Sequence, residues 1–263
     1  MFIGKMVTEA IPARVYALYK IVESKKSITR SELQGLMEPK EIYEGSSYFS
    51  AIMKAAEELK LIENKDNVVS VSHDLEKLKT IADFRKYVIS ILPDLSEGQF
   101  WKSTNIIVNM NEEIYQYSSI ADSGMLNYLS KQLGETVTAP MLRGWRFWSQ
   151  FLGFGFMNEM AFLPNAYVYV KAVLRLMNLE KKQEYAMSDF MAKFMQYGQI
   201  MLSVHTSEKN LNIAMSSALR ELHDNGEIVL KFGSDQELKW ILYPSKELFN
   251  QPVSSVVYKG VKA

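Results

Sequence analysis

Histidine and cysteine are the first residues to consider as catalytic or metal-binding groups. The chain has no cysteine and only three histidines, His73, His205 and His223. No two of them lie three or four residues apart, the spacing that places two imidazoles on one helix face to hold a metal. We therefore expect neither a metal nor another cofactor.

Patterns typical of other enzyme sites are also missing. There is no G-x-x-x-x-G-K-[ST] sequence, and Gly153-Phe-Gly155 lacks the third glycine of G-x-G-x-x-G. The polar run at residues 205–208 has hydrolase-like residue types, but a catalytic triad draws its side chains from separate segments, and these hydroxyls suit a helix cap. The pairs Glu57-Glu58 and Glu112-Glu113 point to different helix faces. We expect a protein that is not an enzyme, with a site of dispersed carboxylates as the remaining alternative.

Lysine, arginine and small polar side chains allow a different chemistry, contact with DNA phosphates and base edges. The carboxylate-poor candidates near the C-terminus are Lys209, Asn210, Asn212, Ser216, Ser217 and Arg220, with Lys231 and Lys239 on adjoining strands. In the middle of the chain, Arg143 and Arg146 stand opposite two tryptophans, an arrangement equally consistent with cation–π packing. Any of these sets can also be an ordinary solvent-facing surface.

A third polar helix face lies near the N-terminus, where Lys54 is accompanied by Glu57 and Glu58. Their carboxylates would repel phosphate, so this face is expected to bind protein instead of DNA. Lys65, in the following hairpin, could add a phosphate contact.

The elements that position these residues are mainly helical. Apolar residues from Ile11 to Val22 recur at helical spacing after Pro12. A capping box, Thr29 to Glu32, begins a second helix, and Ser46 or Ser47 is expected to cap a third with its buried stripe over 49–59. Two β runs then flank the turn at 63–67. Three helices followed by a β-hairpin is the order of a winged helix.

The same pattern returns twice. Helices over 190–197 and 211–222, the second ended by Asn225-Gly226, precede GEIVLKF and ELKWILYP, which flank the turn GSDQ as a hairpin. In the middle, TAPMLRGWRFWSQFLGFGF predicts a helix with Trp145 and Trp148 inward, followed by two short strands ending at Pro164. Repetition of this kind indicates an array of units.

We therefore predict an α+β, mainly α fold of tandem winged-helix units joined by a helical middle region. The expected domains are an N-terminal winged helix (1–74), a helical middle region that could contain a second winged helix (75–180), and a C-terminal winged helix with a short tail (181–263).

Charge and hydropathy limit the partners. The chain has 30 basic and 30 acidic residues and a pI of about 6.9, so it has no overall attraction for nucleic acid or anionic membrane. There is neither a signal-like apolar N-terminal segment nor an apolar run of membrane length. We expect a cytoplasmic protein without membrane contact, and its many aromatic and methionine residues suggest one that docks to other proteins.

The repeated helix-to-hairpin pattern, together with WRFWSQFLGFGF followed by AFLPN, resembles tandem winged-helix proteins of bacterial DNA-processing and anti-phage gene clusters. These include the DpdG-like proteins of deazapurine DNA-modification systems. The architecture is also similar to the tandem winged-helix subunits on the kleisin of bacterial SMC complexes. The resemblance implies a non-catalytic subunit that works beside helicases, nucleases or ATPases, and no site residue is carried over from it.

Together these observations favour an adaptor that binds DNA, partner proteins or both in a prokaryotic multisubunit complex. Its C-terminal unit is expected to touch DNA, weakly on its own, and its first unit to touch protein subunits. The alternative is a transcription regulator that binds duplex DNA as a homodimer.

Overall fold

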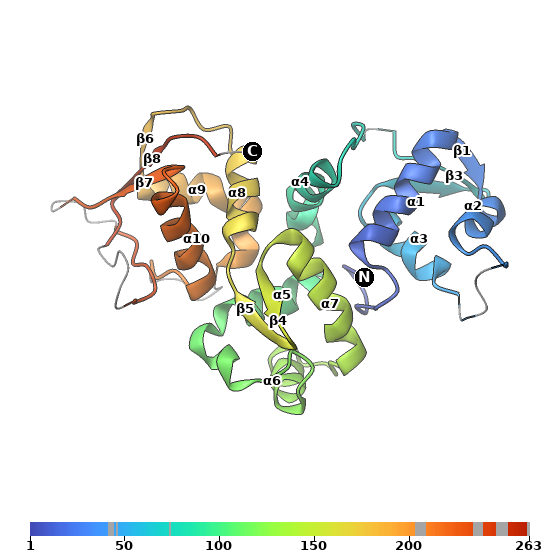
Figure 1. Cartoon of the computed structure of the whole chain (residues 1–263), viewed down its shortest axis with the longest axis horizontal. Coiled ribbons are helices and arrows are strands. Elements are labelled where there is room, and N and C mark those ends of the chain that lie inside the picture. Colours follow the sequence, from blue (N-terminus) through green and yellow to red (C-terminus); the bar gives the residue numbers. More distant parts are fainter. Residues whose placement is uncertain are drawn as a thin grey trace.

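The computed structural model describes residues 1–41, 45, 47–73, 75–202, 209–233, 239–245 and 252–261. Its elements form three groups arranged as a broad V, with the N-terminal group in blue, the middle group at the base and the C-terminal group in orange and red (Figure 1). Helices dominate, and each group contains one small antiparallel sheet. The predicted α+β, mainly helical fold is therefore confirmed. The domain boundaries stay a prediction.

The N-terminal group contains three helices and a three-stranded sheet of order β1-β3-β2. Its elements are α1 (Pro12–Lys25), β1 (Ser27–Thr29), α2 (Arg30–Met37), α3 (Phe49–Glu58), β2 (Ile62–Lys65) and β3 (Val68–Val71). The predicted capping box forms, because the Thr29 side chain accepts from the Glu32 amide and Glu32 bonds back to Thr29. The predicted hairpin also forms, with Asp66 and Asn67 at positive φ in its two-residue turn.

The start of α3 differs from the prediction. Its N-cap is Tyr48, and no side chain of that residue caps the helix. A carboxylate from the end of α2 does so instead: Glu38 Oε1 accepts from the Tyr48 and Phe49 amides at 2.5 and 2.9 Å, and Glu38 Oε2 accepts from the Ser47 hydroxyl at 2.8 Å. Hydrogen bonds from backbone amides to an ionised carboxylate are stronger than those to a neutral hydroxyl, which favours Glu38 over a serine as the cap. The other predicted cap, Ser46, lies outside the described residues.

The middle group consists mainly of helices around two tryptophans. Its elements are α4 (Ile81–Ile91), η1 (Leu92–Leu95), α5 (Gln99–Asn109), η2 (Asn111–Gln116), α6 (Ser123–Leu133), α7 (Ala139–Leu152), β4 (Gly155–Asn158) and β5 (Ala161–Pro164). The predicted helix and the hairpin after it are confirmed. Trp145 and Trp148 are fully buried, and their indole N–H groups donate to Thr104 Oγ1 at 2.8 Å and the Ala10 carbonyl at 2.7 Å.

The C-terminal group has a second three-stranded sheet, of order β6-β8-β7. Its elements are α8 (Tyr167–Leu176), β6 (Glu184–Ala186), α9 (Met187–Gly198), η3 (Gln199–Met201), α10 (Ile213–Asp224), β7 (Ile228–Lys231) and β8 (Ser255–Tyr258). Gly226, at φ 68°, follows the end of α10 as predicted.

The predicted C-terminal hairpin is wrong. β7 pairs with β8, while Trp240 and Ile241 form only single bridges, to Val253 and Asn210. The expected tail is therefore the central strand of the sheet. All four residues of β8 are buried, and its β-branched pair Val256-Val257 suits a strand with neighbours on both sides. Ser234 to Gln236 of the predicted turn lie outside the described residues.

Both end groups share one order of elements: helix, strand, two helices, strand, strand, with the third strand between the first two. In this order α3 and α10 occupy equivalent places.

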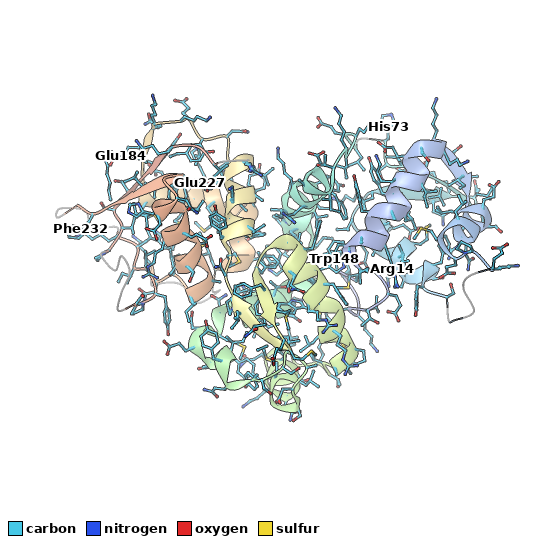
Figure 2. The ribbon with its side chains drawn as sticks, in the orientation of Figure 1. Arg14, His73, Trp148, Glu184, Glu227 and Phe232 are labelled. Atoms are coloured by element: carbon cyan, nitrogen blue, oxygen red, sulfur yellow. The ribbon has the colours of Figure 1, made fainter. Side chains whose placement is uncertain are left out.

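The N-terminal and middle groups are joined by the segment before α1. Phe2 packs edge-on against Phe100 and Trp148, whose ring centroids lie 5.1 and 4.7 Å from its own. Figure 2 shows Trp148 where α7 meets the N-terminal group. Gly144 permits this contact, because a Cβ there would lie 2.4 Å from the Val7 carbonyl oxygen. The buried apolar side chains of all three groups form one continuous cluster.

Candidate nucleic-acid interface

The polar side chains of α10 that the sequence suggested as a DNA-facing surface are largely buried. Asn212, Ser216 and Arg220 are 6 %, 0 % and 5 % exposed. The expectation of one solvent-facing surface is therefore wrong for these three residues. The reason is their bonding within the chain, which uses the same polar atoms that a DNA groove would require.

Arg220 and Ser216 hold a later segment over α10. The Arg220 guanidinium donates to the Tyr243 carbonyl at 2.6 Å, and the Ser216 hydroxyl accepts from the Tyr243 amide at 2.8 Å. Burial lowers the pKa of Arg220, which Asp224 partly opposes. Asn212 caps α10 by accepting from the Met215 amide at 2.9 Å, and it donates to Asn109 Oδ1 at 2.9 Å. The polar groups of these three side chains are thus engaged by contacts within the chain.

The remaining C-terminal candidates are dispersed. The Lys209 carbonyl accepts from the Ile241 amide at 2.8 Å, and Asn210 forms the bridge with Ile241. Ser217 is half-buried. Lys231 pairs with Glu184 at 2.5 Å, and the Lys239 ammonium lies 4.9 Å from the Phe232 ring centroid.

The two middle candidates remain near the surface. Arg143 is exposed on α7. Arg146 is half-buried, with its guanidinium 4.9 Å from the Phe147 ring centroid. Its cation–π partner is therefore the neighbouring Phe147, and not one of the two buried tryptophans that the sequence suggested.

The outer face of α3 is less acidic than its sequence suggests. Glu58 has a side chain only 7 % exposed, because its Oε2 accepts from the Met1 ammonium at 2.8 Å and the Phe2 amide at 2.7 Å. The other carboxylate, Glu57, lies at the C-terminal end of the helix beside a cavity of about 370 Å³ that Lys60 and Tyr87 also line.

The first turns of α3 instead present polar and basic side chains. Ser50 and Lys54 are exposed along one line of α3, which Glu57 continues at the C-terminal end, and Ser47 is exposed just before the helix begins. Arg30, the first residue of α2, lies beside them with Nη2 3.5 Å from Ser50 Oγ and its guanidinium 5.7 Å from the Phe49 ring centroid. On the other flank, the Arg14 guanidinium lies 4.6 Å from the Tyr48 ring centroid, and Figure 2 marks Arg14 on α1. We refer to Arg30, Ser47, Ser50 and Lys54 as the α3 surface.

Neither Arg30 nor Ser50 was among the residues suggested by the sequence. Ser50 had a signal in the sequence, since it falls on the polar side of the predicted helix. No pattern singled out Arg30. What the sequence could not reveal is that Glu58 bonds to the start of the chain.

Within the described residues, no group of three or more His, Asp or Glu side chains could hold a metal ion. The polar run at 205–208 lies outside the described part of the chain. No helix in the described ranges is both long and apolar enough to span a membrane.

The structure thus defines a mainly helical α+β protein with small antiparallel sheets and polar helix faces. The family model described as DpdG-like matches residues 2–236, so the chain belongs to the DpdG-like family. This family suggests a role in a gene cluster for DNA modification or defence. Searches of curated proteins and of solved structures gave no significant match.

Proposed function

We propose that the chain is a non-catalytic, cytoplasmic winged-helix adaptor in a prokaryotic DNA-modification or defence assembly, and that its N-terminal group binds duplex DNA. The winged-helix assignment is supported by the order of elements in both end groups and by their sheet order, first-third-second. In helix-turn-helix proteins the second helix of the motif enters the major groove, and α3 has that place here.

The α3 surface is the observation that carries the DNA proposal. Lys54 and Arg30 supply positive charge beside the Ser47 and Ser50 hydroxyls. Of the carboxylates nearby, Glu58 is bonded to the Met1 ammonium and Glu38 accepts from the Ser47 hydroxyl, which leaves Glu57, at the C-terminal end, as the exposed carboxylate of α3. Such groups bind phosphates and polar base edges. The equivalent face of α10 is covered by Tyr243, so this proposal reverses the sequence-based assignment of DNA to the C-terminal unit.

Partner proteins would then contact the other two groups. Exposed apolar side chains there include Phe156, Phe232 and Ile241, each 47–50 % exposed. Figure 2 shows Phe232 at the outer end of the C-terminal group. Exposed aromatic side chains are favoured anchors at protein interfaces.

The test is fluorescence anisotropy with a labelled random-sequence duplex at low and at physiological salt. We expect affinity that falls steeply with salt, since each phosphate contact releases a counterion. Replacing both Arg30 and Lys54 with alanine should lower the slope of log affinity against log salt by about 2, one for each lost contact.

Lys193→Ala is the control, because Lys193 is an exposed cation on α9, outside the α3 surface. It should leave the slope unchanged. Binding that is indifferent to Arg30 and Lys54 would exclude the α3 surface. Strong preference for one DNA sequence over the random duplex would instead favour the transcription regulator.

A further inference from the structure

The segment before α1 places a further cation beside the α3 surface. A Cβ at Gly4 would lie 3.6 Å from the Lys54 ammonium nitrogen, so the Lys54 side chain reaches over this segment. The next residue, Lys5, is exposed, and its Cα lies about 3.8 Å from that of Gly4 across a trans peptide. Lys5 and Lys54 therefore occupy neighbouring positions on one part of the surface.

The segment is held in place on both sides of Lys5. The Phe2 amide donates to Glu58 Oε2 on α3 at 2.7 Å. At the start of α5, Gly98 lies directly against the segment, because a Cβ there would be 2.1 Å from the Phe2 carbonyl oxygen. After Lys5, Met6 is buried. A cation on a segment that is already ordered loses less conformational entropy on binding than one on a free chain end.

Positive charge predominates around Lys5. Residues 1–7 contain no acidic side chain. Glu58 pairs with the N-terminal ammonium at 2.8 Å, and Glu97, next to Gly98, pairs with Lys102 at 3.2 Å. Lys5 and the cations of the α3 surface are therefore in excess over the carboxylates of residues 1–7 and α3, where Glu57 is the exposed one.

We propose that the DNA surface continues from α3 onto this segment, where Lys5 binds the phosphate next to the one bound by Lys54. The inference rests on the proposed function, since it takes duplex DNA as the ligand of the α3 surface. Along one strand a phosphate recurs about every 3.4 Å of helix axis, so two ammonium groups on neighbouring parts of the protein can each bind one.

DNA bound in this way lies over the junction between the N-terminal and middle groups. Phe2, in the same segment as Lys5, packs against Phe100 of α5 and Trp148 of α7. Figure 1 shows the N-terminus between α7 and α3. The middle group thus contributes to DNA binding by fixing the segment that carries Lys5.

The salt dependence of duplex binding tests Lys5 directly. In the anisotropy titration, Lys5→Ala should lower the slope of log affinity against log salt by about 1, for one lost phosphate contact. Lys5→Arg keeps the charge and should retain the slope of the wild type. Ile3→Ala is the control on the same segment, because Ile3 is uncharged and 58 % exposed, and it should leave the slope unchanged.

The result separates this inference from the proposed function. A slope that falls on replacement of Arg30 and Lys54 but not of Lys5 would overturn the inference and leave the DNA-binding role of α3 intact. If none of the three substitutions changes the slope, or if the wild type does not bind the duplex even at low salt, both are wrong.

Cross-linking measures proximity to DNA independently of charge. The chain contains no cysteine, so Lys5→Cys introduces the only thiol, to which an aryl azide photo-cross-linker can be attached. With the labelled random-sequence duplex we expect a covalent protein–DNA product on illumination. Lys193→Cys, at an exposed position of α9, is the control and should give only background. Equal yields from the two variants would refute a contact between the segment and DNA.

Discussion

Helices α3 and α10 occupy equivalent places in their groups, yet their outer faces have different environments. The outer side of α3 presents Ser50 and Lys54 to solvent, whereas Ser216 and Arg220 of α10 are buried. The cause lies in the strands that follow. β2 and β3 are joined by two residues, but β7 and β8 are separated by residues 232–254, and Tyr243 of this stretch bonds to α10. Whether the polar face of such a helix is exposed or buried thus depends on the length of the connection between the two strands that follow the helix.

The comparison predicts that polar substitutions reduce the free energy of unfolding more in α10 than in α3. Asn212→Ala removes the α10 cap and leaves buried partners at Asn109 and Met201 without their bonds. We expect a loss of about 2 to 4 kcal/mol in the free energy of unfolding. Ser50→Ala, on the exposed side of α3, should change it by less than about 0.5 kcal/mol. Urea denaturation measures both, and equal losses would contradict the distinction between the helices.

A substitution at Ser216 tests more selectively whether the segment around Tyr243 is held against α10. Ser216→Ala removes the acceptor of the Tyr243 amide and should cost about 1 to 2 kcal/mol. Hydrogen exchange should show faster exchange at the Tyr243 amide in particular. Ser217→Ala is the matched control on the neighbouring, half-buried position. If the Tyr243 amide exchanges equally fast in both variants, Ser216 does not hold this segment on α10.

These examples also show which parts of the structure were accessible from sequence. Helical spacing and local turn residues predicted α1, α3, α7 and the hairpins at 62–71 and 155–164, because each depends on neighbours within a few positions. The pairing of Lys231 with Ser255 and the bond of Glu58 to Phe2 join distant parts of the chain. Periodicity carries no information on such contacts, so the exposed face of α3 was judged too acidic and that of α10 too open.

The smallest predicted effect concerns the cap that begins α3. Burial alone would raise the pKa of Glu38, but hydrogen bonds from the Ser47 hydroxyl, the Tyr48 amide and other donors lower it below its ordinary value of 4.5. The ionised carboxylate therefore stabilises the fold at pH values above about 4.5, and this contribution is lost as the pH falls through the lower folded-state pKa.

Glu38→Gln should accordingly cost about 0.5 to 1 kcal/mol at neutral pH, since the amide keeps one acceptor oxygen for the Tyr48 and Phe49 amides but loses the charge at the helix N-terminus. The difference from the wild type should shrink as the pH is lowered below 4.5, and urea denaturation across this range measures it. Glu57→Gln, at the other end of α3, should change stability by less than about 0.5 kcal/mol. A Glu38→Gln penalty that stays constant down to acidic pH would mean that packing, and not the charge, holds the start of α3. The caps of α3 and α10 would then no longer differ in whether charge contributes to their stabilising effect.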